Sequence, residues 1–438
     1  MFESRRLEFL RRMGDAVAII ATHAPRRRNG DVDFRYRPAS SFHYLTGFSE
    51  PEAVLVLRPE RDHEQVVWFV PPKNPEREIW TGRRAGLHGV LSRFGADAAY
   101  PIEELDERLP QLLQNHATLY HGFGHDEQLD RRVLAALQKT RGRTRDGIFA
   151  PAVIIDPGVI LNELRLFKSA GEIDLLRRAA AITARAYAQA MSAARPGMME
   201  FEIEALVDFT FRTNGAIGPG YPTIVAGGEN ATILHYTHND AVLRDGDLLL
   251  IDAGAEVEMY TADVTRTFPV SGSFTPPQRD LYEVVLQAQQ AGIELARPGS
   301  TIEAIHEAAV RQLTSGLLRL GLLRGAIDDL VRARAYRRFY MHRTSHWLGM
   351  DVHDVGDYGA SGKPRELGPG MVLTIEPGLY VERHAAGVDP RYHGVGIRIE
   401  DDLLITPAGH EVLTAAVPRS VAEVESACRK AAIRLAGG

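Results

Sequence analysis

The sequence predicts two domains: an α/β domain at the amino end, followed by an α+β domain built from two related halves. Three observations support this prediction. The 438 residues supply enough chain for two or three domains of ordinary size. Short strand-like and helix-like runs alternate in the first third, and an Ala-Arg-Pro-Gly tetrapeptide occurs twice in the remainder with similar flanking patterns. We therefore expect domains over residues 1–166 and 167–438.

The overall composition excludes several classes of protein. The 57 Asp and Glu residues outnumber the 51 Lys and Arg residues, and the formal net charge of -6 argues against a nucleic-acid partner bound through a general basic field. A single cysteine, Cys428, excludes an intrachain disulfide and leaves too few thiolates for a zinc finger or an iron–sulfur cluster. Because no apolar run approaches the roughly 18 residues of a membrane span, we expect a cytoplasmic protein without a membrane partner.

The first domain is expected to mix strands and helices. Residues 53–57 and 66–70 are apolar runs that predict strands, and the polar–apolar segment 102–113 belongs to the helical runs. Ser169 and Glu172 have the spacing of a capping box before an apolar-periodic run over 173–191. This signal predicts that a long helix opens the second domain.

The second domain contains an internal repeat. Residues 194–197 and 296–299 both read Ala-Arg-Pro-Gly, and each copy lies between two helical stretches. A β-rich stretch follows each copy, over residues 247–268 and 371–406. Two such halves would pack their sheets together with the helices outside, so a cleft is expected where the sheets meet.

Each half contributes two carboxylates that are embedded in β-like runs. The four residues are Asp252, Asp263, Glu376 and Glu400. Buried acids are costly unless they are paired, protonated or bound to cations. Salt bridges to Arg266 and Arg398 are one explanation, but two arginines could neutralise at most half of the set. A shared metal site would relieve all four carboxylates at once.

Histidines near these acids supply further ligands. His342, His346 and His353 lie in one short segment, and on a helix the first two would share a face. Arg343 stands where the HExxH zinc motif needs Glu, which excludes that class of peptidase. His235 follows a glycine-rich turn and could reach the same cleft. Oxygen ligands with one imidazole favour a hard ion such as Mn²⁺, and four carboxylates suit two ions about 3.5–4 Å apart.

With these residues in place, the sequence resembles the pita-bread metallopeptidases of family M24, and among them the bacterial Xaa-Pro aminopeptidases (aminopeptidase P). The resemblance rests on the motifs IDAG, TADVTRTF, SHWLGMDVHDVG, TIEPGLY and GIRIEDD, and on DFRYRPASSFHYLTGFSEPEAVLVL near the start. It implies an α/β creatinase-like amino-terminal domain, followed by an α+β pita-bread catalytic domain with pseudo-twofold duplicated halves.

The resemblance also implies a centre of two divalent ions, most often Mn²⁺, with Co²⁺ or Zn²⁺ as alternatives. Asp263 and Glu400 would bridge the ions, and Asp252 would bind one of them. His346 and Glu376 would bind the other. A hydroxide bridging the ions would attack the scissile carbonyl, while Glu376 relays the proton to the leaving nitrogen.

The same resemblance implies how peptides with proline as second residue would bind. His353 and His235 would steady the substrate carbonyl and the tetrahedral oxyanion. The residues expected to line the proline pocket are His342, Tyr380 and Arg398. Trp80 would face the site of a neighbouring subunit in a homo-oligomer, either a dimer or a tetramer.

Two alternative functions remain open at this point. An Xaa-Pro dipeptidase (prolidase) shares the fold and the metals but needs a cation beside the carboxylate that follows proline, and Arg398 or Arg343 could serve. Arg343 replaces a small residue of many relatives and would either point away from the cleft or narrow its proline side. A non-catalytic peptide-binding module is the second alternative, although such domains typically lose metal ligands and none is missing here.

Overall fold

The protein is described by a computed structural model over residues 1–59 and 64–429. The chain divides into two compact units, Met1–Arg165 and Leu166–Gly438, one residue before the expected boundary. Within the described part of the chain, no helix is both long enough and apolar enough to cross a membrane.

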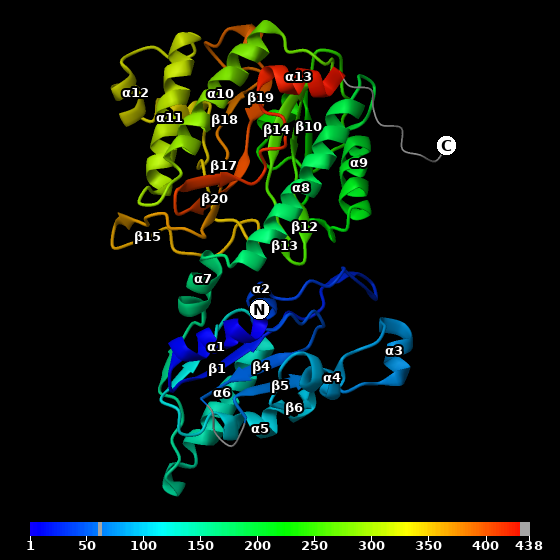
Figure 1. Ribbon diagram of the computed structural model, residues 1–438, viewed down its shortest axis with the longest axis vertical. Coiled ribbons are helices and arrows are strands. Elements are labelled where there is room, and N and C mark those ends of the chain that lie inside the picture. Colours follow the sequence, from blue (N-terminus) through cyan, green and yellow to red (C-terminus); the bar gives the residue numbers. More distant parts are fainter. Residues whose placement is uncertain (60–63, 430–438) are drawn as a thin grey trace. The chain divides into compact units, whose positions relative to one another are not determined.

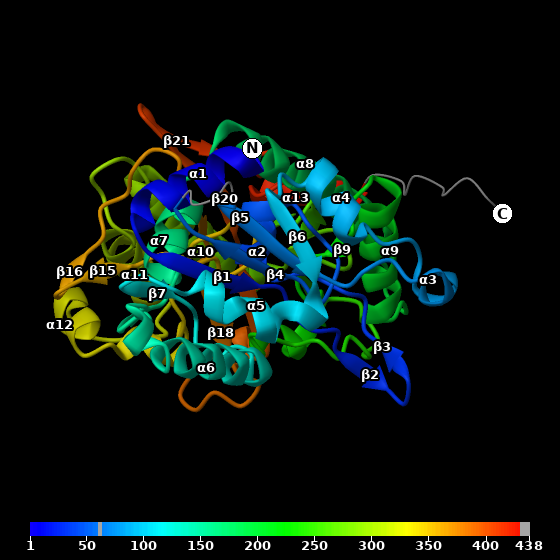
Figure 2. The same cartoon turned by 90° about the horizontal axis from the view of Figure 1, so that it is seen from below.

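The amino-terminal unit is a mixed sheet with helices on both faces (Figures 1 and 2). Its strands lie in the order β6-β5-β4-β1-β7-β8, with β1 antiparallel to β4 and parallel to β7. The sheet strands are β1 (Val17–Ala21), β4 (Val54–Leu57), β5 (Val66–Val70), β6 (Ala98–Pro101), β7 (Thr118–Tyr120) and β8 (Val153–Ile155), with a separate hairpin of β2 (Arg27–Asn29) and β3 (Val32–Asp33). The helices are α1 (Phe2–Met13), α2 (Ser40–Thr46), α3 (Pro75–Thr81), α4 (Gly86–Arg93), α5 (Leu105–Leu112), α6 (Glu127–Arg141) and α7 (Gly158–Leu166).

Alternation along the central strands explains this layered arrangement. Val67 and Phe69 of β5 pack in one apolar cluster with α5 and α6, whereas Trp68 between them contacts the rings of Phe42 and Phe48 on the other face. Both faces are apolar, so the strands are continuous hydrophobic runs. The strands predicted over 53–57 and 66–70 are thereby confirmed.

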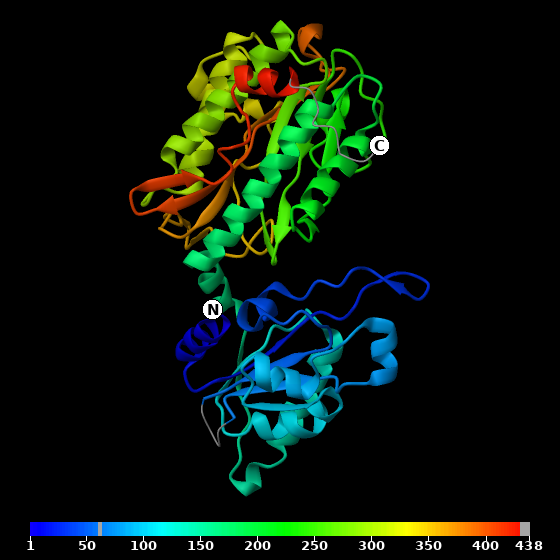
Figure 3. The same cartoon turned by 45° about the vertical axis from the view of Figure 1, so that its right-hand side comes forward.

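The second unit consists of short sheets between two pairs of long helices (Figures 1 and 3). The strands of the first half are β9 (Gly218–Pro219), β10 (Ile224–Gly227), β11 (Leu248–Asp252), β12 (Ala255–Val257), β13 (Tyr260–Thr261) and β14 (Thr265–Pro269). Those of the second half are β15 (Gly359–Ala360), β16 (Lys363–Pro364), β17 (Val372–Ile375), β18 (Gly378–Val381), β19 (Val395–Arg398), β20 (Asp401–Thr406) and β21 (Gly409–Val412). The helices are α8 (Ala170–Ala193), α9 (Glu200–Thr213), α10 (Pro276–Leu295), α11 (Ile302–Arg319), α12 (Ile327–Arg332) and α13 (Val421–Arg429).

The repeat predicted from the Ala-Arg-Pro-Gly copies is confirmed. One copy separates α8 from α9, and the other separates α10 from α11. The helix predicted over 173–191 is α8, and it begins with the expected capping box between Ser169 and Glu172. The two halves meet where β14 approaches β19. At this junction the Thr267 hydroxyl donates to the carbonyl of Arg398 at 3.1 Å. This junction brings the two β-rich stretches together.

Candidate active site

The four carboxylates lie where strands of the two halves begin or end. Asp252 is the last residue of β11, Asp263 lies between β13 and β14, Glu376 follows β17, and Glu400 lies between β19 and β20. The expectation that all four are embedded in strands is therefore wrong for three of them. Residues at strand ends escape the strict alternation of a strand, so side chains from four segments can turn toward one place.

The pairing of β11 with β14 brings the first two acids together. Asp252 lies opposite Thr265, two residues after Asp263. The hydroxyl of Tyr221 lies 2.7 Å from Oδ1 of Asp252 and 2.5 Å from Oδ1 of Asp263. Because a phenol has a single proton to donate, it cannot satisfy both carboxylates. The pair retains acceptor oxygens that a cation would satisfy.

His346 joins the acids of the two halves. Its Nε2 lies 3.4 Å from Oδ2 of Asp263 and 3.4 Å from Oε1 of Glu376, while its Nδ1 bonds the carbonyl of Trp347 at 3.0 Å. That second bond orients the ring so that Nε2 faces the carboxylates. One ligand atom each from Asp263, His346 and Glu400 lies within 4.8 Å of the others, close enough to hold one metal ion.

The segment that carries these histidines is not a helix. Residues 341–350 contain no helical turn, and Trp347 instead forms an isolated bridge to Leu373 of β17. The shared helical face suggested for His342 and His346 is therefore wrong. In this extended segment both histidines still approach Glu376. Nδ1 of His342 lies 3.7 Å from Oε2 of Glu376, and Nε2 of His346 lies 3.4 Å from Oε1.

The raised pKa values of the carboxylates reflect how little positive charge lies near them. Burial raises the pKa of Glu376 to about 7, and burial with the charge of Asp263 raises the pKa of Glu400 well above its ordinary value. Burial also raises the pKa of Asp252, although Arg398 opposes this shift. Clustered buried acids of this kind favour protons or cations. An oxygen-rich donor set with one imidazole fits divalent ions of the hard class.

Arg266 and Arg398 neutralise little of the negative charge of the four carboxylates. Arg266 pairs with Asp401 at 2.7 Å, both fully buried, so it neutralises none of the four acids. Arg398 donates to Asp252 at 2.6 Å. The salt-bridge explanation thus covers one carboxylate of the four.

A hydrogen-bonded chain runs from Arg398 to His342. The Arg398 guanidinium lies 3.0 Å from the Tyr380 hydroxyl, which lies 2.8 Å from Nε2 of His342. Burial, followed by the charge of Arg398, lowers the pKa of His342 to about 3. The neutral ring can then donate from Nδ1 to the carbonyl of Arg343 and accept from Tyr380 at Nε2. These three expected pocket residues form one connected wall.

The two other histidines expected at the site are more exposed. The ring of His353 lies perpendicular to that of His346, with centroids 4.4 Å apart. Burial and the charge of His346 lower the pKa of His353, and the charge of His235 adds to this effect. His235 also lowers the pKa of His342, after burial and Arg398. His235 is therefore within electrostatic range of both rings.

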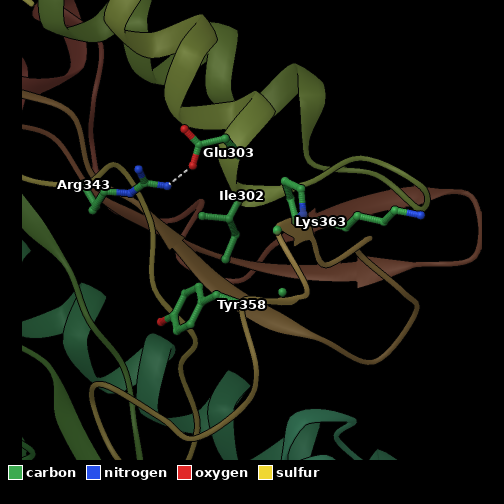
Figure 4. A pocket seen from close by; sticks show the side chains of 8 residues that line it. Ile302, Glu303, Arg343, Tyr358 and Lys363 are labelled. Carbon is green, nitrogen blue, oxygen red and sulfur yellow. Dashed lines mark hydrogen bonds and ion pairs between the residues drawn. The ribbon is translucent and has the colours of Figure 1, made fainter.

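Arg343 points into a separate pocket of about 340 Å³ (Figure 4). Its guanidinium pairs with Glu303 at the start of α11. Ile302, Tyr358 and Lys363 also line this pocket. The side chain is thus paired with α11, whereas Arg398 contacts Asp252 and Tyr380.

Trp80 belongs to the amino-terminal unit. It lies in the short helix α3 and is 88% exposed, beside Ile79 at 81%.

Sequence reasoning missed two polar residues that hold the acids. Tyr221 lies in a Gly-Tyr-Pro turn, and no sequence signal connected it to Asp252 or Asp263. Thr265 donates to Oε2 of Glu400 at 2.6 Å and accepts from Arg398 at 3.0 Å. Its position inside the TADVTRTF motif was the only available signal.

The chain is similar to known peptidases along most of its length. Residues 174–407 match metallopeptidase family M24, and residues 2–120 match the aminopeptidase P N-terminal domain. An Xaa-Pro aminopeptidase of Escherichia coli (strain K12) is 46% identical over 427 residues, which are 97% of this chain and 96% of the relative. The structure of a Pseudomonas aeruginosa aminopeptidase superposes with a TM-score of 0.96 at 45% identity, covering 98% of this chain and 97% of the other. Zinc-substituted E. coli aminopeptidase P in complex with product gives 0.94 at 45% identity, with coverages of 98% and 97%.

Proposed function

The chain belongs to metallopeptidase family M24, and we propose how its own residues hydrolyse a peptide bond. It is an aminopeptidase with a divalent metal site, and it hydrolyses the amino-terminal Xaa-Pro bond of peptides. The observation that carries the proposal is the convergence of three buried carboxylates, the partly buried carboxylate of Glu376 and one imidazole from both halves of the second unit.

Five residues of this cluster would hold two divalent ions, and Mn²⁺ suits their oxygen-rich donor set best. They are Asp252, Asp263, His346, Glu376 and Glu400. When bound, such ions polarise a carbonyl and make a water molecule nucleophilic at neutral pH. Asp263 and Glu400 would hold both ions, since one ligand atom of each lies within 4.8 Å of the other and of His346.

Glu376 would move the proton during hydrolysis. Its two oxygens face His346 at 3.4 Å and His342 at 3.7 Å, so the carboxylate is held between two rings. In this position it would accept a proton from the attacking water and deliver it to the proline nitrogen. Proline has no N–H and leaves as a secondary amine, so a protonating group close to that nitrogen is essential.

The remaining histidines would orient the substrate. His353 and His235 would donate to the carbonyl oxygen of the scissile bond as negative charge develops there. The wall formed by His342, Tyr380 and Arg398 would receive the proline ring. Because Arg398 holds both Asp252 and Tyr380, it would keep this wall at a constant distance from the metal ligands.

We also propose two properties of the whole protein. The highly exposed Trp80 and Ile79 on α3 support a homo-oligomer, either a dimer or a tetramer, in which Trp80 faces the site of a neighbouring subunit. The single cysteine, Cys428, is buried and unpaired, which suits the reducing cytoplasm.

A pair of peptides tests the proposed function. Incubating the Mn²⁺-loaded protein with Xaa-Pro and Xaa-Pro-Yaa-Zaa, and following the products by mass spectrometry, distinguishes an aminopeptidase from a dipeptidase. We expect release of the first residue from the longer peptide. Cleavage of the dipeptide alone would show the prolidase activity instead, and no cleavage of either peptide would favour a non-catalytic module.

A further inference from the structure

A completely buried ion pair lies behind the histidine segment and has no part in the reaction described above. Nζ of Lys168 lies 3.1 Å from Oδ2 of Asp354, and each side chain is 1% exposed. Nζ also lies 3.4 Å from the carbonyl of Leu166. Removing two charges from water is costly, and apolar residues of similar volume often stabilise a core as well or better. The position of this pair therefore calls for an explanation beyond stability.

Asp354 immediately follows His353, and its backbone is tied to the metal-ligand segment. The amide of Asp354 donates to the carbonyl of Trp347 at 2.9 Å, the same carbonyl that bonds Nδ1 of His346 at 3.0 Å. One carbonyl thus connects the residue after His353 with the ring of His346. A shift of Asp354 would move the ring of His353 against that of His346.

The turn between these residues is packed closely around the ion pair. A Cβ added to Gly349 would lie 2.2 Å from Oδ2 of Asp354 and 2.9 Å from Cε of Lys168. The carbonyl of Gly349 accepts from the amide of Thr261 at 3.0 Å, so the turn is also anchored to β13. Lys168 itself is held by a backbone bond from its amide to the carbonyl of Gly370 at 2.8 Å.

We propose that Lys168 is a positioning residue for hydrolysis, which fixes His353 over the substrate carbonyl by holding Asp354. This inference rests on the role proposed for His353 above. The contacts described for Lys168 are with Asp354, Leu166 and Gly370 and include none of the five metal-ligand residues, so its effect on turnover should pass through His353. It should leave metal binding unchanged.

A double-mutant cycle tests this positioning role. A misplacement of about 1 Å can cost about 100-fold in rate, so Lys168→Met should lower kcat/KM by about 10-fold to 100-fold. His353→Ala should lower it by at least as much. The combined variant should be no slower than His353→Ala alone, since a ring that is absent cannot be misplaced. Mn²⁺ stoichiometry, measured by calorimetry, should match the unmodified protein in all three variants.

Further variants separate positioning from folding. Removing one partner of a buried pair can unfold a protein, whereas Lys168→Met with Asp354→Asn leaves no buried charge uncompensated. We expect this pair of substitutions to restore the melting temperature but not kcat/KM. Arg311→Met breaks an exposed pair with Asp328 and serves as the matched control, with unchanged activity expected.

Three outcomes would overturn the proposal. If the losses of kcat/KM in Lys168→Met and His353→Ala multiply in the combined variant, Lys168 acts independently of His353. If Lys168→Met with Asp354→Asn recovers kcat/KM together with the melting temperature, the role of Lys168 is purely structural. Full activity of His353→Ala would overturn the positioning role together with the proposed role of His353. The first two outcomes leave the proposed function intact.

Discussion

Glu376 is the residue on which the proposed chemistry depends most. Its oxygens face His346 and His342, and no other carboxylate of the cluster has an imidazole facing each of its oxygens among the described contacts. We expect Glu376→Gln to lower kcat by about 10²- to 10⁴-fold, because an amide cannot transfer the proton. Steady-state hydrolysis of an Xaa-Pro peptide, with circular dichroism to verify folding, measures this effect.

The control for this variant is a nearby acid outside the cluster. Glu382 is exposed and follows the strand β18 that carries Tyr380, so Glu382→Gln should keep its activity. A Glu376→Gln variant that folds and turns over at the unmodified rate would remove Glu376 from the proton pathway.

A second residue, in the amino-terminal unit, makes stability depend on pH. Both ring nitrogens of His43 in α2 are buried and without a hydrogen-bond partner in the described part of the chain. Burial, followed by the charges of Arg37 and Arg5, lowers the pKa of His43 to about 4. The corresponding pKa in an unfolded chain is about 6.5. Between these pH values the unfolded chain binds a proton that the folded chain does not.

The contribution of His43 to the free energy of unfolding is therefore complete above about pH 6.5 and is lost as the pH falls toward about 4. As the pH falls from about 6.5 to about 4, we expect the free energy of unfolding of His43→Leu to fall less than that of the unmodified protein. Urea denaturation at several pH values measures both. An identical pH slope in both proteins would show that His43 is protonated in the folded state.

Single residues also show what could be predicted without the structure. The four acids could be proposed as metal ligands because each lies in or at the end of a β-like run, and such a placement is visible in the sequence. Tyr221 and Lys168 could not, because their partners lie 31 and 186 positions away in the chain. A hydroxyl or an ammonium group in an ordinary local context has no signal until folding brings its partner to it.

At the scale of elements, the segment that follows β11 and the segment that precedes β14 must approach each other closely. A Cβ on Gly254 would lie 1.7 Å from the carbonyl oxygen of Ala262, which directly precedes Asp263. We expect Gly254→Ala to force these segments apart, at a cost of about 1–3 kcal/mol in the free energy of unfolding. Mn²⁺ affinity should fall in parallel, because Asp252 and Asp263 would separate.

Chemical denaturation and calorimetric titration of Gly254→Ala check these two effects. Gly142→Ala is the control, since its added Cβ would meet no atom closer than 3.3 Å. Unchanged stability together with unchanged affinity would show that the close approach is not needed for the site.

The elements differ in how far local signals determine them. The helix α8 was predicted correctly because its capping box and apolar period are local properties of the chain. Spacing alone suggests that His342 and His346 share a helical face. In the structure Trp347 forms a bridge to Leu373, and the segment that carries the two histidines is extended. Tertiary contacts of that kind override local spacing, and they are common at functional sites.

At the scale of the whole molecule, metal should stabilise one unit of the chain. The carboxylate cluster lies in the unit Leu166–Gly438, where bound cations would relieve its repulsion. At a free metal concentration 100-fold above Kd, the expected gain is about 2.7 kcal/mol in the free energy of unfolding. Calorimetric scans with Mn²⁺ and with a chelator should differ in the transition of this unit, and less in that of Met1–Arg165.

Asp263→Asn supplies the control for metal removal. The variant loses one shared carboxylate, so added Mn²⁺ should raise its melting temperature much less. An equal rise in the variant and the unmodified protein would place the stabilising ion elsewhere.

We propose that five residues from both halves of the second unit hold two ions in one site. Anomalous diffraction from crystals of the Mn²⁺-loaded protein, collected at the manganese edge, tests this claim most directly. We expect two anomalous peaks, contacted by Asp252, Asp263, His346, Glu376 and Glu400. Peaks away from these residues, or no peak at saturating Mn²⁺, would contradict it.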